Sequence, residues 1–131
     1  MRSFRNSLFF LSLALLFALA PRAGAHARML KSIPARGAEL SASPVQLDLW
    51  FNELLEDGFN TIEVFPSSEL AAGKHSSLTR GKVMVDPNDR THLTVKLGTL
   101  APGGYVVDWR VLSRDGHSAP GRMTFTIKAA K

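Results

Sequence analysis

YVVDWRVLSRDGHSAPGRMTFTI, residues 105–127, is the segment from which the fold class follows most directly. Its two halves alternate apolar and polar residues with a period of two, which puts the apolar side chains of each half on one face of a β-strand. Asp115-Gly116, a common turn-forming pair, separates the two halves. The stretch therefore predicts two strands joined by a turn. The residues expected to face inward are Tyr105, Val107, Trp109, Val111, Met123, Phe125 and Ile127.

The same alternation recurs towards the N-terminus, and pairs or clusters of Pro, Gly, Asp and Asn separate the runs. Short strands at this spacing predict an all-β sandwich or barrel. The polar stretch 67–80 has no clear period, so we expect a surface loop there, with one helical turn near Leu70. The alternating runs are residues 45–52, 61–64, 82–86 and 92–97.

Residues 1–25 have the pattern of a secretory signal peptide. Arg2 and Arg5 precede an apolar run over residues 8–20, and Ala23-Gly24-Ala25 fits a signal peptidase site. The apolar run is shorter than the roughly 20 residues that cross a bilayer as a helix, which makes an uncleaved anchor the weaker alternative. The pattern predicts export to the periplasm, cleavage after Ala25, and a single domain over residues 26–131 that begins with His26.

Charge and cysteine content restrict the function of this domain. Beyond residue 25 there are thirteen basic and eleven acidic residues, a net charge of +2, so the concentrated basic face of a nucleic-acid-binding protein is not expected. The sequence has no cysteine, so a metal site must use imidazole, carboxylate, amine or thioether ligands. That choice favours Cu(II) over structural zinc or an iron–sulfur cluster.

A histidine at the first position of the mature chain is a candidate metal ligand. His26 would offer two nitrogens, its α-amine and its ring Nδ1, which together can close a six-membered chelate. The α-amine has a pKa of about 8, so a metal ion can displace its proton near neutral pH. The alternative is that His26 only begins the chain and is solvated, as chain termini often are.

The segment Arg114-Asp115-Gly116-His117 offers two further ligands. In an extended backbone, residues two apart point to the same side, and Gly116 adds no side chain between them. Asp115 and His117 would then complete a four-donor site with His26. The alternative is that Asp-Gly simply forms a turn.

The chain resembles the CopC family of periplasmic copper-binding proteins over nearly all of residues 26–131. The resemblance is strongest in residues 100–117, LAPGGYVVDWRVLSRDGH, and continues in residues 121–127. Further matches are His26-Ala27, the segment PARGAEL at residues 34–40, and PVQLDLWFNE at residues 44–53. One departure is a proline at position 120, which many relatives carry directly after the histidine of the Asp-Gly-His motif.

The resemblance implies a Greek-key β-sandwich or barrel related to immunoglobulin-like and cupredoxin folds. It also implies that His26, through its amine and ring, binds Cu(II) together with Asp115 and His117. The function implied is copper sequestration, homeostasis or resistance, or delivery of copper to a CopD-like inner-membrane transporter, by a monomer.

The remaining histidines, the methionines and Trp50 are set aside as ligands. His75 lies in the polar loop and His92 at a solvent-facing strand position, so we expect both to be solvated. Trp50 lies opposite the apolar set of its strand and is expected to be exposed or at a sheet edge. Three scattered methionines do not form the clustered loop that binds Cu(I) in some relatives: Met29, Met84 and Met123.

Two other classes of function remain as alternatives. An N-terminal histidine chelate also resembles the copper centre of polysaccharide monooxygenases, but Asp115 would fill a position that oxygen chemistry needs open. We therefore expect a binding protein and not an enzyme. The third possibility is a metal-free immunoglobulin-like structural module, which predicts absent or weak copper binding.

Overall fold

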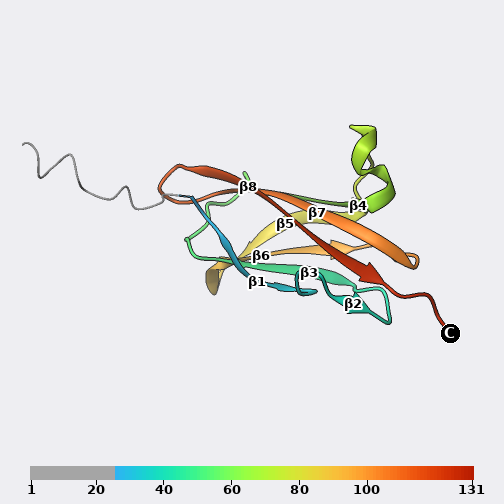
Figure 1. The fold of residues 1–131 in the computed structure, drawn as a ribbon. Coiled ribbons are helices and arrows are strands. Elements are labelled where there is room, and N and C mark those ends of the chain that lie inside the picture. Colours follow the sequence, from blue (N-terminus) through green and yellow to red (C-terminus); the bar gives the residue numbers. More distant parts are fainter. Residues whose placement is uncertain (1–25) are drawn as a thin grey trace, which may run out of the picture.

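Two four-stranded β-sheets pack face to face in the computed structural model, which describes residues 26–131 (Figure 1). The strand order is β1-β3-β6-β5 in the first sheet and β2-β8-β7-β4 in the second. Each sheet keeps two edge strands, so the chain forms the predicted sandwich and does not close into a barrel. The strands are β1 Met29–Ile33, β2 Glu39–Leu40, β3 Gln46–Phe51, β4 Thr61–Pro66, β5 Thr79–Asp86, β6 Asp89–Leu97, β7 Gly103–Leu112 and β8 Ser118–Ile127.

Strands β7 and β8 confirm the alternation that predicted the fold. They pair antiparallel along their whole length, from Gly103 opposite Ile127 to Leu112 opposite Ser118. All seven side chains expected to face inward are buried. They meet the inward residues of the other sheet, such as Leu47, Leu49 and Leu93, in one continuous core. Burial of these apolar side chains supplies the stability that disulfides cannot supply in a chain without cysteine.

Trp109 explains why a glycine stands at position 121. The two residues are directly opposite each other in the β7–β8 pair, and the indole of Trp109 lies where a Cβ on Gly121 would have to be. The rings of Trp109 and Phe51 also pack edge to face, with centroids 6.2 Å apart. A side chain at position 121 would therefore displace the largest aromatic group of the core.

The pattern missed two strands and misplaced one residue. β1 is interrupted by an irregularity between Met29 and Lys31, and β2 has only two residues, which pair parallel with β8. Neither is long or regular enough to show a period of two. The alternating run 45–52 starts one residue too early, because β3 begins at Gln46 and Val45 is 76% exposed.

The outer face of the second sheet is partly covered by the predicted loop. Residues Ser67–Ala72 form a short 3-10 helix, η1, so the expected helical turn is confirmed. Beyond it, the ring of His75 stacks on Phe65 with centroids 3.5 Å apart, and Phe65 and Val106 are buried on this face. Within residues 26–131 no helix has the length and apolar character needed to cross a membrane.

Candidate metal centre

The link between β7 and β8 is a tight turn that holds both candidate ligands of the Asp-Gly-His motif. The Ser113 amide donates to the carbonyl of His117 at 3.0 Å, and the Gly116 amide donates to the carbonyl of Ser113 at 2.9 Å. Gly116 has a φ of 89°, a conformation that other residues rarely adopt. The extended geometry expected here is therefore wrong. The turn, given above as the alternative, brings Asp115 and His117 together instead.

Within this turn, three groups surround one oxygen of the Asp115 carboxylate. Oδ1 accepts hydrogen bonds from the Ser113 hydroxyl and from the His117 amide, and it lies 3.2 Å from Nδ1 of His117. The Ser113 hydroxyl, followed by the His117 amide, lowers the pKa of Asp115 to about 2. The carboxylate is consequently ionised at any pH near neutrality and available to a cation.

The chain enters the sandwich beside this turn. In Figure 1 the blue segment that leads into β1 starts at the end of the molecule where β7 turns into β8. The rings of His26 and His117 lie 6.3 Å apart in an edge-to-face arrangement. Ala27 is buried. Arg28 exchanges hydrogen bonds with Asn52, whose side chain accepts from the Arg28 amide at 2.6 Å. The residues that follow His26 are thus fixed, and they hold His26 next to His117.

The three candidate ligands share one exposed end of the molecule. The side chain of His117 is 54% exposed and that of Asp115 43% exposed, so both are open to an incoming ion. In residues 26–131 no three His, Cys, Asp or Glu side chains are grouped closely enough to hold a metal ion as they stand. The chemistry of the set nevertheless fits Cu(II), which favours nitrogen and oxygen donors such as two imidazoles and a carboxylate.

Similarity to known proteins covers the whole sandwich. The CopC domain family model matches residues 29–128. The chain belongs to the CopC family. It is 33% identical to protein YobA of Escherichia coli K12 over 97% of this chain and 96% of YobA. It is 32% identical to copper transport protein CutJ of Bacillus subtilis over 96% of this chain, but that match spans only 22% of CutJ.

A solved structure supports the same assignment. The crystal structure of CopC from Methylosinus trichosporium OB3b matches with a TM-score of 0.67 and 29% identity, over 81% of this chain and 97% of that chain. The resemblance predicted from the sequence is therefore confirmed, as is the CopC-type sandwich. The family includes at least one protein named for copper transport.

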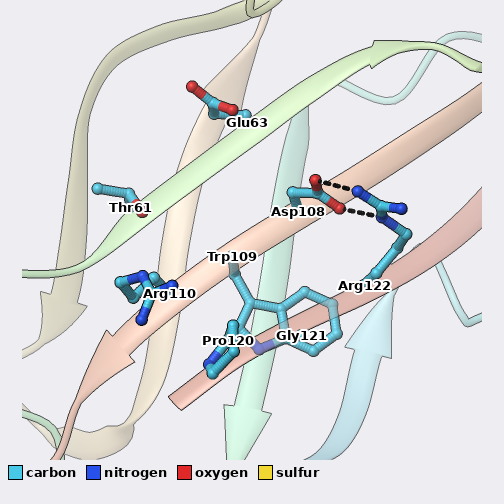
Figure 2. Close-up of a pocket in the computed structure, with 8 residues that line it drawn as sticks. All are labelled: Thr61, Glu63, Asp108, Trp109, Arg110, Pro120, Gly121 and Arg122. Atoms are coloured by element: carbon cyan, nitrogen blue, oxygen red, sulfur yellow. Dashed lines mark hydrogen bonds and ion pairs between the residues drawn. The ribbon is translucent and has the colours of Figure 1, made fainter. Parts of the chain in front are cut away.

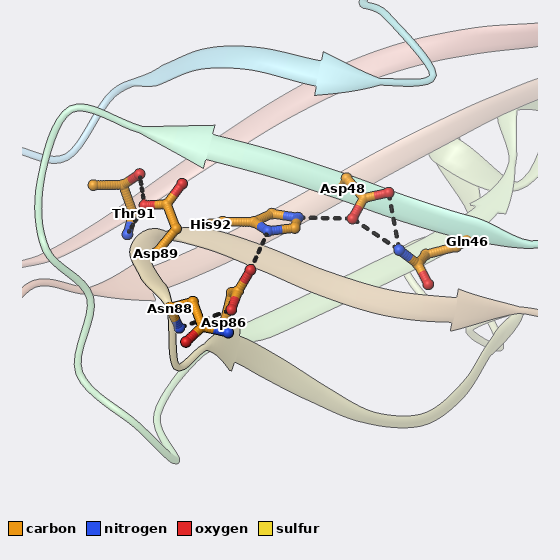
Figure 3. Close-up of polar contacts among 7 residues, drawn as sticks. All are labelled: Gln46, Asp48, Asp86, Asn88, Asp89, Thr91 and His92. Carbon is orange, nitrogen blue, oxygen red and sulfur yellow. Dashed lines mark hydrogen bonds and ion pairs between the residues drawn. The ribbon is translucent and has the colours of Figure 1, made fainter.

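In this CopC-family chain, His92 is not solvated, so that prediction is wrong. Its side chain is 15% exposed, and a carboxylate lies at each ring nitrogen: Asp48 at 2.7 Å from Nε2 and Asp86 at 3.3 Å from Nδ1 (Figure 3). The indole of Trp50 stacks on the imidazole at 4.3 Å, and Lys31 lies 4.5 Å from the Trp50 ring centroid. His92 joins β3, β6 and β5 on the outer face of the first sheet, and its two nitrogens are already engaged.

His75 was also expected to be solvated, and its side chain is only 19% exposed. It contacts Glu63 at 3.1 Å as well as Phe65. Of the methionines, Met123 lies in the core as expected, Met29 packs against it, and Met84 is exposed.

A pocket of about 490 Å³ lies on the outer face of the second sheet (Figure 2). Its charges largely compensate one another: Arg122 binds both carboxylate oxygens of Asp108, at 2.5 and 2.7 Å, which lowers the pKa of Asp108. Glu63 is paired with His75 outside it. The pocket contains none of His26, Asp115 and His117 and offers no alternative to them as a metal site.

Sequence reasoning missed two residues that position the candidate ligands. Ser113 bonds to Asp115, and Asn52 anchors the backbone after His26. Ser113 lies in the segment LAPGGYVVDWRVLSRDGH quoted above. Its position two residues before Asp115 was the feature from which a contact between the two could have been predicted. Asn52 is far from His26 in sequence, and only the pairing of β1 with β3 brings the two regions together.

Proposed function

We propose that this chain is a periplasmic Cu(II)-binding protein, which sequesters copper for homeostasis or resistance or delivers it to a membrane copper transporter. The proposed ligands are His26, Asp115 and His117. One observation carries the proposal: the ring of His26 lies beside that of His117, in whose turn the ionised carboxylate of Asp115 is held. Membership of the CopC family supports copper as the ion.

Residues 1–25, which lie outside the described residues, are proposed to be a signal peptide that is cleaved after Ala25. The domain of residues 26–131 then begins with the free α-amine of His26. This amine and Nδ1 of the same residue chelate Cu(II), since a copper ion competes effectively with the amine proton near neutral pH.

We infer that copper is cargo and that the protein is not an enzyme. An amine, two imidazoles and a carboxylate fill the four positions that Cu(II) binds most strongly, and none is left for oxygen or an organic substrate. Delivery would be to a CopD-type inner-membrane transporter, by a monomer. The match to CutJ supports such a partner, because there a CopC-like segment is a small part of a longer copper transport protein.

The test begins with the intact mass of the exported protein, which identifies its first residue. Cu(II) affinity is then compared between this protein and a form that keeps one extra alanine before His26. We expect the extra residue to remove most of the affinity, because the amine is no longer part of the chelate. A form with alanine added after Lys131 is the matched control.

Equal affinity of the two N-terminal forms would contradict the amine chelate. Rapid peroxide formation by the copper-loaded protein with ascorbate would contradict a carrier and favour an oxidative enzyme. Absent or weak binding at micromolar copper would favour a structural module.

A further inference from the structure

Ser32 and Ser113 are the buried polar residues of the described sandwich, and they differ in what their hydroxyls do. Ser113 is 1% exposed and Ser32 is 7% exposed. Within residues 26–131, Oγ of Ser32 has no hydrogen-bond partner. Oγ of Ser113 contacts two acceptors, Oδ1 of Asp115 and the carbonyl oxygen of His117, the second at 3.1 Å. A buried hydroxyl is unfavourable unless it is bonded, so Ser113 is held against these two groups.

The Ser113 hydroxyl contacts the Asp115 carboxylate directly, and the ring of His117 contacts the same carboxylate oxygen. The Ser113 hydroxyl and the His117 amide both donate to Oδ1 of Asp115. Nδ1 of His117 faces the same oxygen at 3.2 Å. Among the described residues, the other carboxylate oxygen, Oδ2, and the other ring nitrogen, Nε2, have no such contacts. One side of each ligand is fixed inside the turn, and one atom of each is left for an ion.

Ser113 can fix these groups because it is itself anchored. It forms an isolated β-bridge with Leu55, which is fully buried, and the next amide, that of Arg114, donates to the carbonyl of Leu54 at 2.9 Å. The turn is therefore attached to the segment that follows β3, and not only to its own two strands. An anchored hydroxyl inside a metal-binding turn restricts the side chains that it contacts.

We propose that Ser113 is a positioning residue of the copper site, which holds Asp115 and His117 so that Oδ2 and Nε2 are the atoms presented to Cu(II). This inference rests on the proposed function. Groups that orient metal ligands commonly contribute about 10- to 100-fold to metal affinity. Ser113 touches the ligands and not the ion, so its effect is on affinity and on the geometry of the bound copper.

The test measures Cu(II) affinity of the exported protein by competition with a chelator, the electron paramagnetic resonance spectrum of the copper form, and thermal unfolding without copper. We expect Ser113→Ala to weaken Cu(II) binding by about 10- to 100-fold and to change the spectrum. Ser32→Ala is the matched control, because it removes a buried hydroxyl that has no partner, and it should leave both copper measurements unchanged. Ser113→Thr, which retains a hydroxyl, should keep most of the affinity.

A purely structural serine would lower the unfolding temperature of Ser113→Ala without changing its affinity or its spectrum, and that result would overturn the inference. If Ser113→Ala does not fold, Ser113→Thr and Ser113→Val are compared instead. These two side chains have nearly the same shape, but threonine has a hydroxyl where valine has a methyl group. Equal copper binding by these two variants would also overturn it. Failure of the unmodified protein to bind Cu(II) would refute the proposed function itself, a result distinct from either of these.

Discussion

Two regions of this molecule combine histidine with aspartate, and they use the pair in opposite ways. At the end of the sandwich, Asp115 and His117 are about half exposed. Among residues 26–131, Oδ2 of Asp115 and Nε2 of His117 have no hydrogen-bond or ion-pair partner. On the outer face of the first sheet, His92 is almost enclosed, and Asp48 and Asp86 occupy both of its ring nitrogens. Residue types alone therefore do not define a metal site. An unengaged donor atom that an ion can reach is also required.

The largest effect on copper binding is expected when an imidazole is removed from the exposed region. We expect His117→Ala to lower Cu(II) affinity by roughly 100-fold or more, equivalent to about 2.7 kcal/mol, because a direct ligand is lost. The stability of the copper-free protein should change little, since the side chain is largely solvated. Competition with a chelator measures the affinity. His75→Ala is the control, and equal affinities of the two variants would contradict the assignment.

The opposite result is expected for the enclosed region. His92→Ala should lower the free energy of unfolding by about 1–3 kcal/mol, because two carboxylates lose the partner that lies between them. Its Cu(II) affinity should equal that of the unmodified protein. Urea denaturation measures the first quantity and chelator competition the second. If His92→Ala remained fully stable but bound copper poorly, the roles of the two regions would have to be exchanged.

The sequence predicted most of the fold because alternation is a local property. Residues such as Trp109 and Phe125 reveal their orientation from their immediate neighbours, whereas β2 depends on parallel pairing with β8, which no local period reports. The same distinction applies to the histidines. His92 is opposite Trp50 in the β3–β6 pair, and its acidic partners come from two other strands, so its engagement could not be predicted from position. His117 and Asp115 are close in sequence, and the Asp-Gly pair predicted a turn between the two strands. The sequence left open whether an extended backbone or this turn would bring the two side chains together.

The carboxylates around His92 also contribute to stability, and this contribution depends on pH. The pKa of Asp86 is lowered by the amide of Asn88 and then by the ring of His92. A carboxylate with a lowered pKa stabilises the folded state above its unfolded pKa of about 3.9, and this contribution is lost as the pH falls through the folded value. We expect the stability difference between the unmodified protein and Asp86→Asn to shrink as the pH falls below about 4. Urea denaturation at a series of pH values measures it.

Asp108 and Asp115 also have lowered pKa values, but they are common to both proteins and Asp86 does not affect them, so their contributions cancel in this difference. The pKa of Asp89 is lowered chiefly by Thr91, and the charge of Asp86 is the smallest influence on it. Introducing Asp86→Asn into the His92→Ala variant tests whether the imidazole of His92 causes the pH dependence of this stability difference. With His92 absent, only the Asn88 amide and weaker backbone contacts still lower the pKa of Asp86, so the pH-dependent difference should be smaller than with His92 present. An undiminished difference would mean that the loop at Asn88, and not His92, accounts for the acid sensitivity of this region. The enclosed histidine would then join the strands without holding Asp86 in its charged form.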